Sequence, residues 1–206
     1  MEHFVITVAR GYGSGGEEIA TKIAADLGIP CYENRILTLA SQLSGLDEHL
    51  FQEVNERGKE KKYSALLKAL PKTMRPKTYD KEFVSDERLF EFQKEIIEQL
   101  AKTESCVIVG KCADWILKDY PNVVSVYIEA PRAFCLKNVM KKMNVSEETA
   151  HMAISRTDQY RANYYKHYTG GNYWTNPVNY DLTLNSQRVG IDRCVTLIKQ
   201  YLQLKF

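Results

Sequence analysis

The sequence has few of the features that mark a specialised class of protein. No segment of its 206 residues approaches the roughly 18 uninterrupted apolar residues of a membrane span, and the N-terminus lacks the charged and apolar regions of a secretory signal. Lys and Arg together number 28 against 26 for Asp and Glu, so no overall basic field favours nucleic acid as a partner. We therefore expect a cytoplasmic protein that binds neither membranes nor nucleic acid.

Cysteine is also sparse and shows no functional spacing. The five cysteines are scattered, and none forms a C-x-x-C pair or a His-paired metal motif: Cys31, Cys106, Cys112, Cys135 and Cys194. This pattern predicts reduced thiols, mostly in the core, and no protein-held metal site. With 44% hydrophobic and 26% charged residues, the chain suits one compact domain with a sizeable core.

What is present is an alternation of short apolar runs and longer helical patterns. The apolar runs predict strands at 4–9, 29–32, 106–109, 123–128 and 181–184. Helical periodicity predicts helices at 16–27, over most of 35–70, at 85–102, after Pro131, at 146–168 and at 189–204, with a turn at 185–186. This order predicts an α/β fold with a parallel sheet covered by helices on both faces.

The glycine-rich stretch from Gly11 to Gly16 lies where the first strand meets the first helix. Backbone N–H groups converge in such a turn, and the helix dipole favours an anion, so the stretch predicts a phosphate site. It fits the dinucleotide pattern G-x-G-x-x-G, with Glu33 as the ribose ligand of an oxidoreductase. It also fits the G-x-x-x-x-G spacing of a phosphate loop, although Glu17 and Glu18 replace the expected Lys and Ser/Thr. A tight turn that binds nothing is the third alternative.

Cations later in the chain favour the phosphate loop. Lys111 follows a predicted strand, at the sheet edge where α/β proteins bind ligands. Arg156 and Arg161 lie on the helix predicted at 146–168, which could close over a nucleotide. Phosphoryl transfer depends on such converging charges. A dinucleotide fold, in contrast, needs a strong second strand, and the run at 29–32 is short and contains Pro30.

The most basic part of the chain, residues 57–81, has two interpretations. Its Lys and Arg residues show no periodicity and are interrupted by Pro71 and Pro76. The segment is either a solvent-facing connection or a surface for an anionic ligand.

Taken together, six motifs resemble the cytidylate kinase-like family, a nucleoside monophosphate (NMP) kinase branch of the P-loop NTPase superfamily. They are residues 9–20, 28–32, 109–114, 128–131, 158–165 and 179–182, so the resemblance spans nearly the whole chain. It implies a three-layer P-loop NTPase-type fold with a five-stranded parallel sheet and helices on both faces. It also implies a core at 1–32, 103–143 and 173–206, a helical NMP-binding region at about 33–100 and a helical lid at about 144–172.

The resemblance further implies transfer of phosphate from ATP, with Mg²⁺, to CMP or a related small phosphorylated acceptor; a homodimer is left open. The donor-binding residues it implies are Gly11, Tyr12, Gly13, Ser14, Gly15, Gly16, Glu17, Glu18 and Arg188. The acceptor-side residues are Tyr32, Glu33, Arg35 and Asp114, and the catalytic residues are Lys111, Arg156, Asp158 and Arg161. Lys111 stands where the family usually has Arg, and acts as a point charge rather than a fork.

The chain departs from authentic nucleotide kinases at Glu17 and Glu18, which put negative charge beside the phosphate site. A non-catalytic nucleotide- or anion-binding protein of the same fold is therefore an alternative. The direction of the Glu17 carboxylate bears directly on the choice.

Overall fold

The computed structural model describes residues 3–33, 35–44 and 86–206. The chain divides into two compact units, one formed by 1–33 with 97–206 and the other by 34–96. The second unit contains α2 (Arg35–Ser44) and the first part of α5 (Asp86–Thr103). The helices predicted between 45 and 70 and the basic segment 57–81 lie outside the described residues.

The first unit is built on a five-stranded parallel sheet of order β2-β3-β1-β4-β5. Its strands are β1 (Val5–Arg10), β2 (Cys31–Tyr32), β3 (Cys106–Val109), β4 (Val123–Glu129) and β5 (Leu182–Asn185). The central strands are continuous apolar runs because both of their faces are covered. The α/β fold with a five-stranded parallel sheet, predicted from the sequence, is confirmed.

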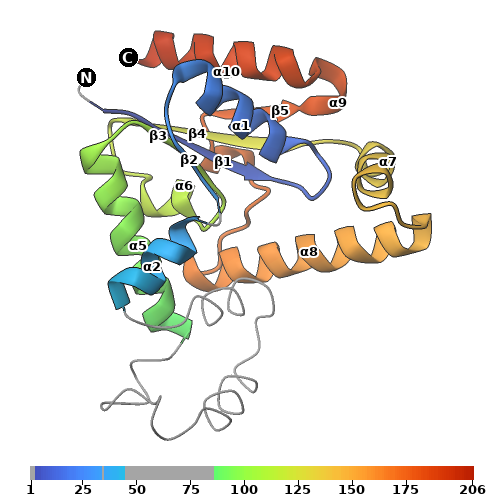
Figure 1. The fold of residues 1–206 in the computed structure, drawn as a ribbon, viewed down its shortest axis with the longest axis horizontal. Helices are drawn as coiled ribbons and strands as arrows, with labels where there is room; N and C mark the ends of the chain where they lie inside the picture. Colours follow the sequence, from blue (N-terminus) through green and yellow to red (C-terminus); the bar gives the residue numbers. More distant parts are fainter. Residues whose placement is uncertain (1–2, 34, 45–85) are drawn as a thin grey trace, which may run out of the picture. The chain divides into compact units, whose positions relative to one another are not determined.

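One face of the sheet packs against α1 (Gly16–Leu27) and α10 (Ile191–Lys205), which lie on the same side of it (Figure 1). The core between them is formed by alternate residues of the central strands and the apolar stripes of both helices. In α1 this stripe contains Ile19 and Ile23, which are fully buried. This packing fixes the first turn of α1 against the carboxyl ends of the strands.

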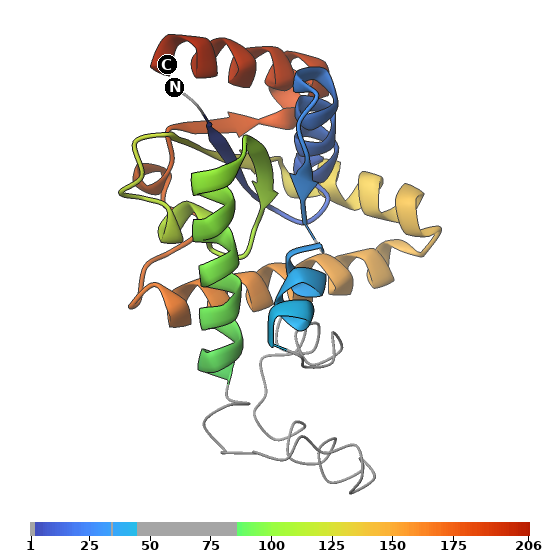
Figure 2. The ribbon, with the colours of Figure 1, turned by 60° about the vertical axis from the view of Figure 1, so that its left-hand side comes forward.

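The opposite face carries an aromatic cluster centred on Tyr127 of β4. Its ring stacks on Tyr180 at 5.3 Å and meets Trp174 edge-on at 5.7 Å. The short helix α6 (Ala113–Ile116), which the sequence did not predict, lies on this side of the sheet (Figure 2). The segment between α8 and β5 includes a short 3₁₀ turn, η2 (Pro177–Asn179).

Helices α7 (Arg132–Met143) and α8 (Glu147–Tyr168) pack on each other through a small apolar cluster that includes Leu136, Val139 and Ile154. The side chain of Ser146 accepts a hydrogen bond from the backbone of Thr149 and begins α8, as its sequence predicts. Tyr12, from the glycine-rich loop, packs against the same cluster. The loop is therefore attached to both helices.

The prediction of a turn at 185–186 is wrong. Asn185 is the N-cap of a further short helix, α9 (Ser186–Val189), because its side chain accepts the backbone N–H of Arg188. Helix α9 ends at Gly190, and the closing helix, α10, therefore begins at Ile191.

All five cysteines are free thiols; Cys31 is partly exposed and the other four are buried. Among the described residues, no helix combines the length and apolarity needed to cross a membrane.

Candidate active site

The glycine-rich loop, residues 11–15, connects β1 to α1 in a fixed conformation. Gly13 adopts a left-handed conformation with φ of 85°, and a Cβ there would lie 2.7 Å from the backbone oxygen of Cys135. The Ser14 hydroxyl donates to the carbonyl of Gly11 at 2.8 Å, and Ser186 donates to the carbonyl of Ser14. Asn138 of α7 donates to the carbonyl of Gly13 at 2.9 Å. The carbonyl groups of Gly11, Gly13 and Ser14 are therefore all bonded to side chains of the protein.

The loop's N–H groups are largely free. Five backbone amides of the loop and of the first turn of α1 have no acceptor within the described part of the chain: those of Gly13, Gly15, Gly16, Glu17 and Glu18. The last three belong to the first turn of α1, where unpaired donors and the helix dipole favour an anion. The predicted phosphate site thus has the donors that it requires.

The two glutamates after the loop bond elsewhere. Glu17 forms an ion pair of 2.9 Å with Lys142 at the end of α7. Glu18 pairs with Lys22, one turn along α1, at 3.3 Å. Neither carboxylate accepts from a loop N–H, and each is partly neutralised by its lysine. The negative charge at positions 17 and 18 is therefore turned toward cations of the surface.

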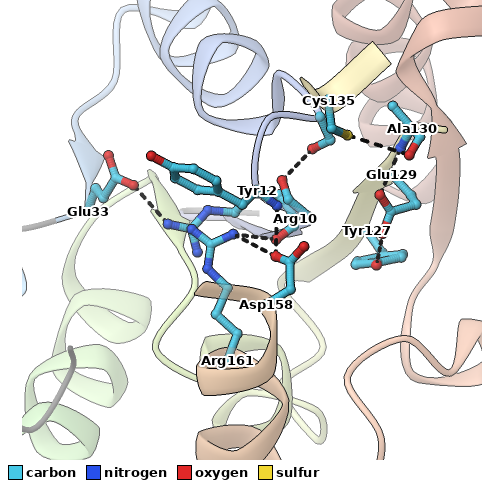
Figure 3. Close-up of polar contacts among 11 residues, drawn as sticks. Arg10, Tyr12, Glu33, Tyr127, Glu129, Ala130, Cys135, Asp158 and Arg161 are labelled. Atoms are coloured by element: carbon cyan, nitrogen blue, oxygen red, sulfur yellow. Dashed lines mark hydrogen bonds and ion pairs between the residues drawn. The ribbon is translucent and has the colours of Figure 1, made fainter. Parts of the chain in front are cut away.

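Three cations from three elements gather beside the loop. Arg10, the last residue of β1, forms a 2.9 Å ion pair with Glu33. Arg161 reaches from α8 and donates to the carbonyl of Arg10 at 2.9 Å, with its guanidinium over the ring of Tyr12 (Figure 3). Lys111 follows β3 at the same edge of the sheet. The carboxyl ends of the central strands therefore present positive charge next to the free amides.

Lys111 lies in an unusual stretch of backbone. Gly110, Lys111 and Cys112 all have positive φ, of 73°, 60° and 55°. Such conformations are costly for residues with a Cβ and cluster at functional sites. Burial, followed by the charges of Arg10 and Arg161, lowers the pKa of the Lys111 amine to about 7. The amine is thus poised to change its charge near neutral pH.

Asp158 on α8 bonds directly to the loop. Its Oδ1 accepts the backbone N–H of Tyr12 at 2.9 Å and lies 3.7 Å from Arg161 (Figure 3). Burial raises the pKa of this carboxyl group. One loop amide is therefore occupied by a carboxylate of the protein, at a place where a ligand anion could bind.

Glu129 is the carboxylate that lies against the start of the loop. A Cβ on Gly11 would stand 2.5 Å from its Oε1. The Tyr127 hydroxyl and the Ala130 backbone N–H donate to its two oxygens. Among the described residues no three acidic, His or Cys side chains form a metal cluster, but Mg²⁺ in phosphate sites needs only one or two carboxylates. Glu129 fits the role of that ligand.

The structure also describes four other residues predicted from the sequence. Arg156 is exposed on α8, and Arg188 is exposed on α9 with its backbone bonded to Asn185. The Tyr32 hydroxyl donates to Glu104 at 2.7 Å. Arg35 begins α2, in the second unit. Their predicted roles remain predictions.

Asp114, predicted on the acceptor side, is a buried residue in the first turn of α6. It accepts a 2.7 Å hydrogen bond from Tyr165 and lines a 330 Å³ pocket with Asn179 and Tyr180. Burial raises its pKa from 3.8 to about 6. Between pH 3.8 and about pH 6, the Asp114 carboxyl is therefore mostly protonated in the folded protein and mostly ionised in the unfolded chain.

We expect this group to make stability fall as pH rises from about 4 to about 6. The unfolding free energy should drop by about 3 kcal/mol over that range because of Asp114 alone. Asp114→Asn keeps the acceptor oxygen for Tyr165 and removes the proton, so its stability relative to wild type should rise over the same range. Urea unfolding at several pH values measures the difference. Asp119→Asn, at an exposed carboxyl, should track wild type, and a constant offset for Asp114→Asn would contradict the expectation.

Arg10, Glu129, Asn138 and Lys142 contact the loop or its flanking residues, and no motif in the sequence assigned a role to them. Arg10 and Glu129 could have been found, since both end strands at the carboxyl edge of the sheet. Asn138 and Lys142 carry no such signal, because only the packing of α7 brings them to the loop.

The dinucleotide alternative is wrong. In a dinucleotide-binding fold the second strand lies beside the first, whereas here β3 separates β1 from β2. Glu33, the predicted ribose ligand, is paired with Arg10 instead.

Comparison with known proteins agrees with this arrangement. A crystal structure of an uncharacterized protein from Eubacterium ventriosum ATCC 27560 is 25% identical and superposes with a TM-score of 0.71, covering 98% of this chain and 99% of that one. Shikimate kinase from Bacteroides thetaiotaomicron is 11% identical, with a TM-score of 0.53 and coverage of 97% and 98%. Shikimate kinase from Acinetobacter baumannii, in complex with shikimate, is 11% identical, with a TM-score of 0.52 and coverage of 98% and 93%.

The two shikimate kinases show a shared kinase fold. No curated protein matches the sequence. The family model for the cytidylate kinase-like family matches residues 5–188. This match spans most of the chain, so the protein belongs to the cytidylate kinase-like family, and its function is of the nucleotide or small-molecule kinase-like type.

Proposed function

We propose that the protein transfers the terminal phosphate of ATP to a small phosphorylated acceptor of the nucleoside monophosphate type, with CMP as the first candidate. The observation that carries this proposal is the placement of free loop amides beside Arg10, Lys111 and Arg161 at one sheet edge. Amides and cations in this arrangement suit a donor phosphate and an acceptor phosphate, respectively.

Each group has a defined task in such a transfer. The amides from Gly13 to Glu18 bind the donor phosphates, and Arg161 stabilises the charge on the transferred group. Lys111 faces the acceptor. Glu129 would hold Mg²⁺, which would supply positive charge that offsets the charge of the phosphates. The cation that a phosphate loop usually carries is absent at Glu17, so Arg161 and Lys111 supply the charge.

A second candidate is a protein that binds nucleotide without transferring phosphate. It is favoured by Glu17 and Glu18, which stand where kinases carry a Lys and a hydroxyl, and by Asp158, which occupies the Tyr12 amide. Binding without turnover is expected if the cation missing at Glu17 is not replaced by other groups, since binding then depends on the loop amides alone.

A coupled assay of ADP release separates the two candidates. We expect Mg²⁺-ATP with CMP, or with another member of a nucleotide and nucleoside panel, to give turnover well above that of the double variant Lys111→Ala/Arg161→Ala. Arg193→Ala, at an exposed arginine of α10, should retain wild-type turnover. Calorimetry with ATP runs in parallel: binding without turnover identifies the second candidate, and no binding of any nucleotide contradicts both.

A further inference from the structure

Arg10 stands at the centre of the cation group, and although the function proposed above counts it among the cations of this edge, neither that proposal nor the sequence motifs give it a task of its own. Its guanidinium crosses Gly110 so closely that a Cβ there would lie 2.5 Å from Nη1. Its Nη2 pairs with Glu33, and its carbonyl holds Arg161. The side chain is 16% exposed, so it lies largely within the protein but still reaches solvent.

The contacts of Arg10 leave donor capacity. A guanidinium carries five N–H donors, and among the described residues only Nη2 has an acceptor, Glu33. Glu33 is itself partly exposed, at 29%. An incoming anion can therefore bind the remaining donors of Arg10, or replace Glu33, without opening the core.

The charges of the group do not balance. Three cations, Arg10, Lys111 and Arg161, face two carboxylates, Glu33 and Asp158. Asp158 is also committed to the amide of Tyr12. The group therefore carries a net positive charge, and because Coulomb attraction is proportional to the charge of the anion, a doubly charged phosphate is attracted more strongly than a singly charged group.

We propose that Arg10 is a ligand-binding residue which, with Lys111 and Arg161, holds the dianionic phosphate group of the acceptor. This assignment rests on the function proposed above and adds a residue to its acceptor side. Arg10 supplies the planar fork that Lys111 cannot supply, since a lysine binds phosphate as a point charge.

The site has a consequence for protons. The groups that act on Lys111 are Arg10 on β1 and Arg161 on α8, which favour the neutral amine, and Glu33 after β2, which favours the charged one; Cys112 adjoins it in sequence. Because the pKa of Lys111 is about 7, part of the protein carries a neutral amine at pH 7.5. A dianion beside it favours the ammonium form, so binding takes up a proton. Affinity should then fall by up to about tenfold per pH unit above pH 7.5.

The test uses the full chain and two probes, inorganic phosphate and CMP, titrated by calorimetry in two buffers of different ionisation enthalpy. Wild type should bind both with uptake of a fraction of a proton at pH 7.5. Arg10→Met should weaken binding at least tenfold, and Arg10→Lys, which keeps the charge but not the fork, should fall between them. Lys111→Arg should bind without proton uptake and without the loss of affinity at higher pH. Arg193→Ala should behave as wild type.

Circular dichroism establishes whether each variant is folded. If Arg10→Met does not fold, Arg10→Lys still tests the proposal. Phosphate binding that is unchanged in both Arg10 variants would overturn the proposal. So would the absence of phosphate and CMP binding to wild type. Binding that depends on Arg10 in a protein without turnover supports the assignment while the proposed transfer fails. Turnover with CMP that is unchanged in Arg10→Lys and Arg10→Met leaves the transfer intact and rejects the assignment.

Discussion

Arg161→Ala is expected to lower the kcat/KM for phosphate transfer by roughly 10³-fold, the effect of removing an arginine that stabilises a transferring phosphoryl group. Arg161 is the residue of α8 that contacts the end of β1, through the carbonyl of Arg10. It also stacks over Tyr12 and lies near Asp158. Its pKa is lowered to about 10 by burial and by Arg10, so it keeps its charge at neutral pH. Steady-state kinetics with the best acceptor measure the loss.

Three controls give this experiment its meaning. Arg161→Lys should restore only part of the rate, because it keeps the charge and loses the fork. Arg193→Ala should leave both rate and stability unchanged. Arg156→Ala, at an exposed residue five positions earlier on α8, tests the role predicted from the sequence for that residue. A rate for Arg161→Ala within threefold of wild type would contradict the function assigned to it.

Gly13→Ala is expected to destabilise the protein by about 3 kcal/mol or more. A left-handed residue with a Cβ costs about 1–2 kcal/mol, and forcing atoms into a filled space costs about 1–3 kcal/mol in addition. The added methyl group would lie 2.7 Å from the carbonyl oxygen of Cys135 and 3.0 Å from Val139. The oxygen belongs to the backbone of α7, so relief requires a shift of that helix. Urea unfolding measures the change.

Gly28→Ala is the matched control for this prediction. Gly28 ends α1 in a left-handed conformation with φ of 64°, and a methyl group added there would meet no atom within 4 Å. It should lose only the backbone contribution, about 1–2 kcal/mol. Equal losses for Gly13→Ala and Gly28→Ala would show that contact with α7 contributes nothing. Loss of ATP binding in Gly13→Ala alone would tie the same contact to the shape of the loop.

The sheet and most helices could be predicted because their signals are local. The strand at 106–109 and the helix at 16–27 coincide with β3 and α1, since a buried parallel strand is a short apolar run and a helix repeats its apolar face. The prediction for residues 185–186 was less accurate. At Asn185 the same residue type serves a turn or a helix cap, and only the acceptance of the Arg188 N–H decides between them.

The candidate site was predictable where it depended on the loop itself, and not where it depended on partners. Glycine spacing predicted a turn with convergent backbone amides, and the strand at 106–109 predicted Lys111 at the carboxyl edge of the sheet. The direction of Glu17 follows from Lys142, which is 125 positions away, and the bond from Tyr12 to Asp158 spans 146 positions. Such contacts are set by how α7 and α8 pack on the core, which no local pattern in the chain encodes.

The left-handed backbone at Lys111 and Cys112 shows that stability and function compete at this edge of the sheet. Two consecutive residues with a Cβ are held there in a conformation that costs about 1–3 kcal/mol each, and the lysine is held where its own charge is disfavoured. The surrounding core offsets both penalties, with Cys112 3% exposed. Glycine at position 111 would adopt this conformation without strain, but it would remove the positive charge that Lys111 brings to the edge of the sheet.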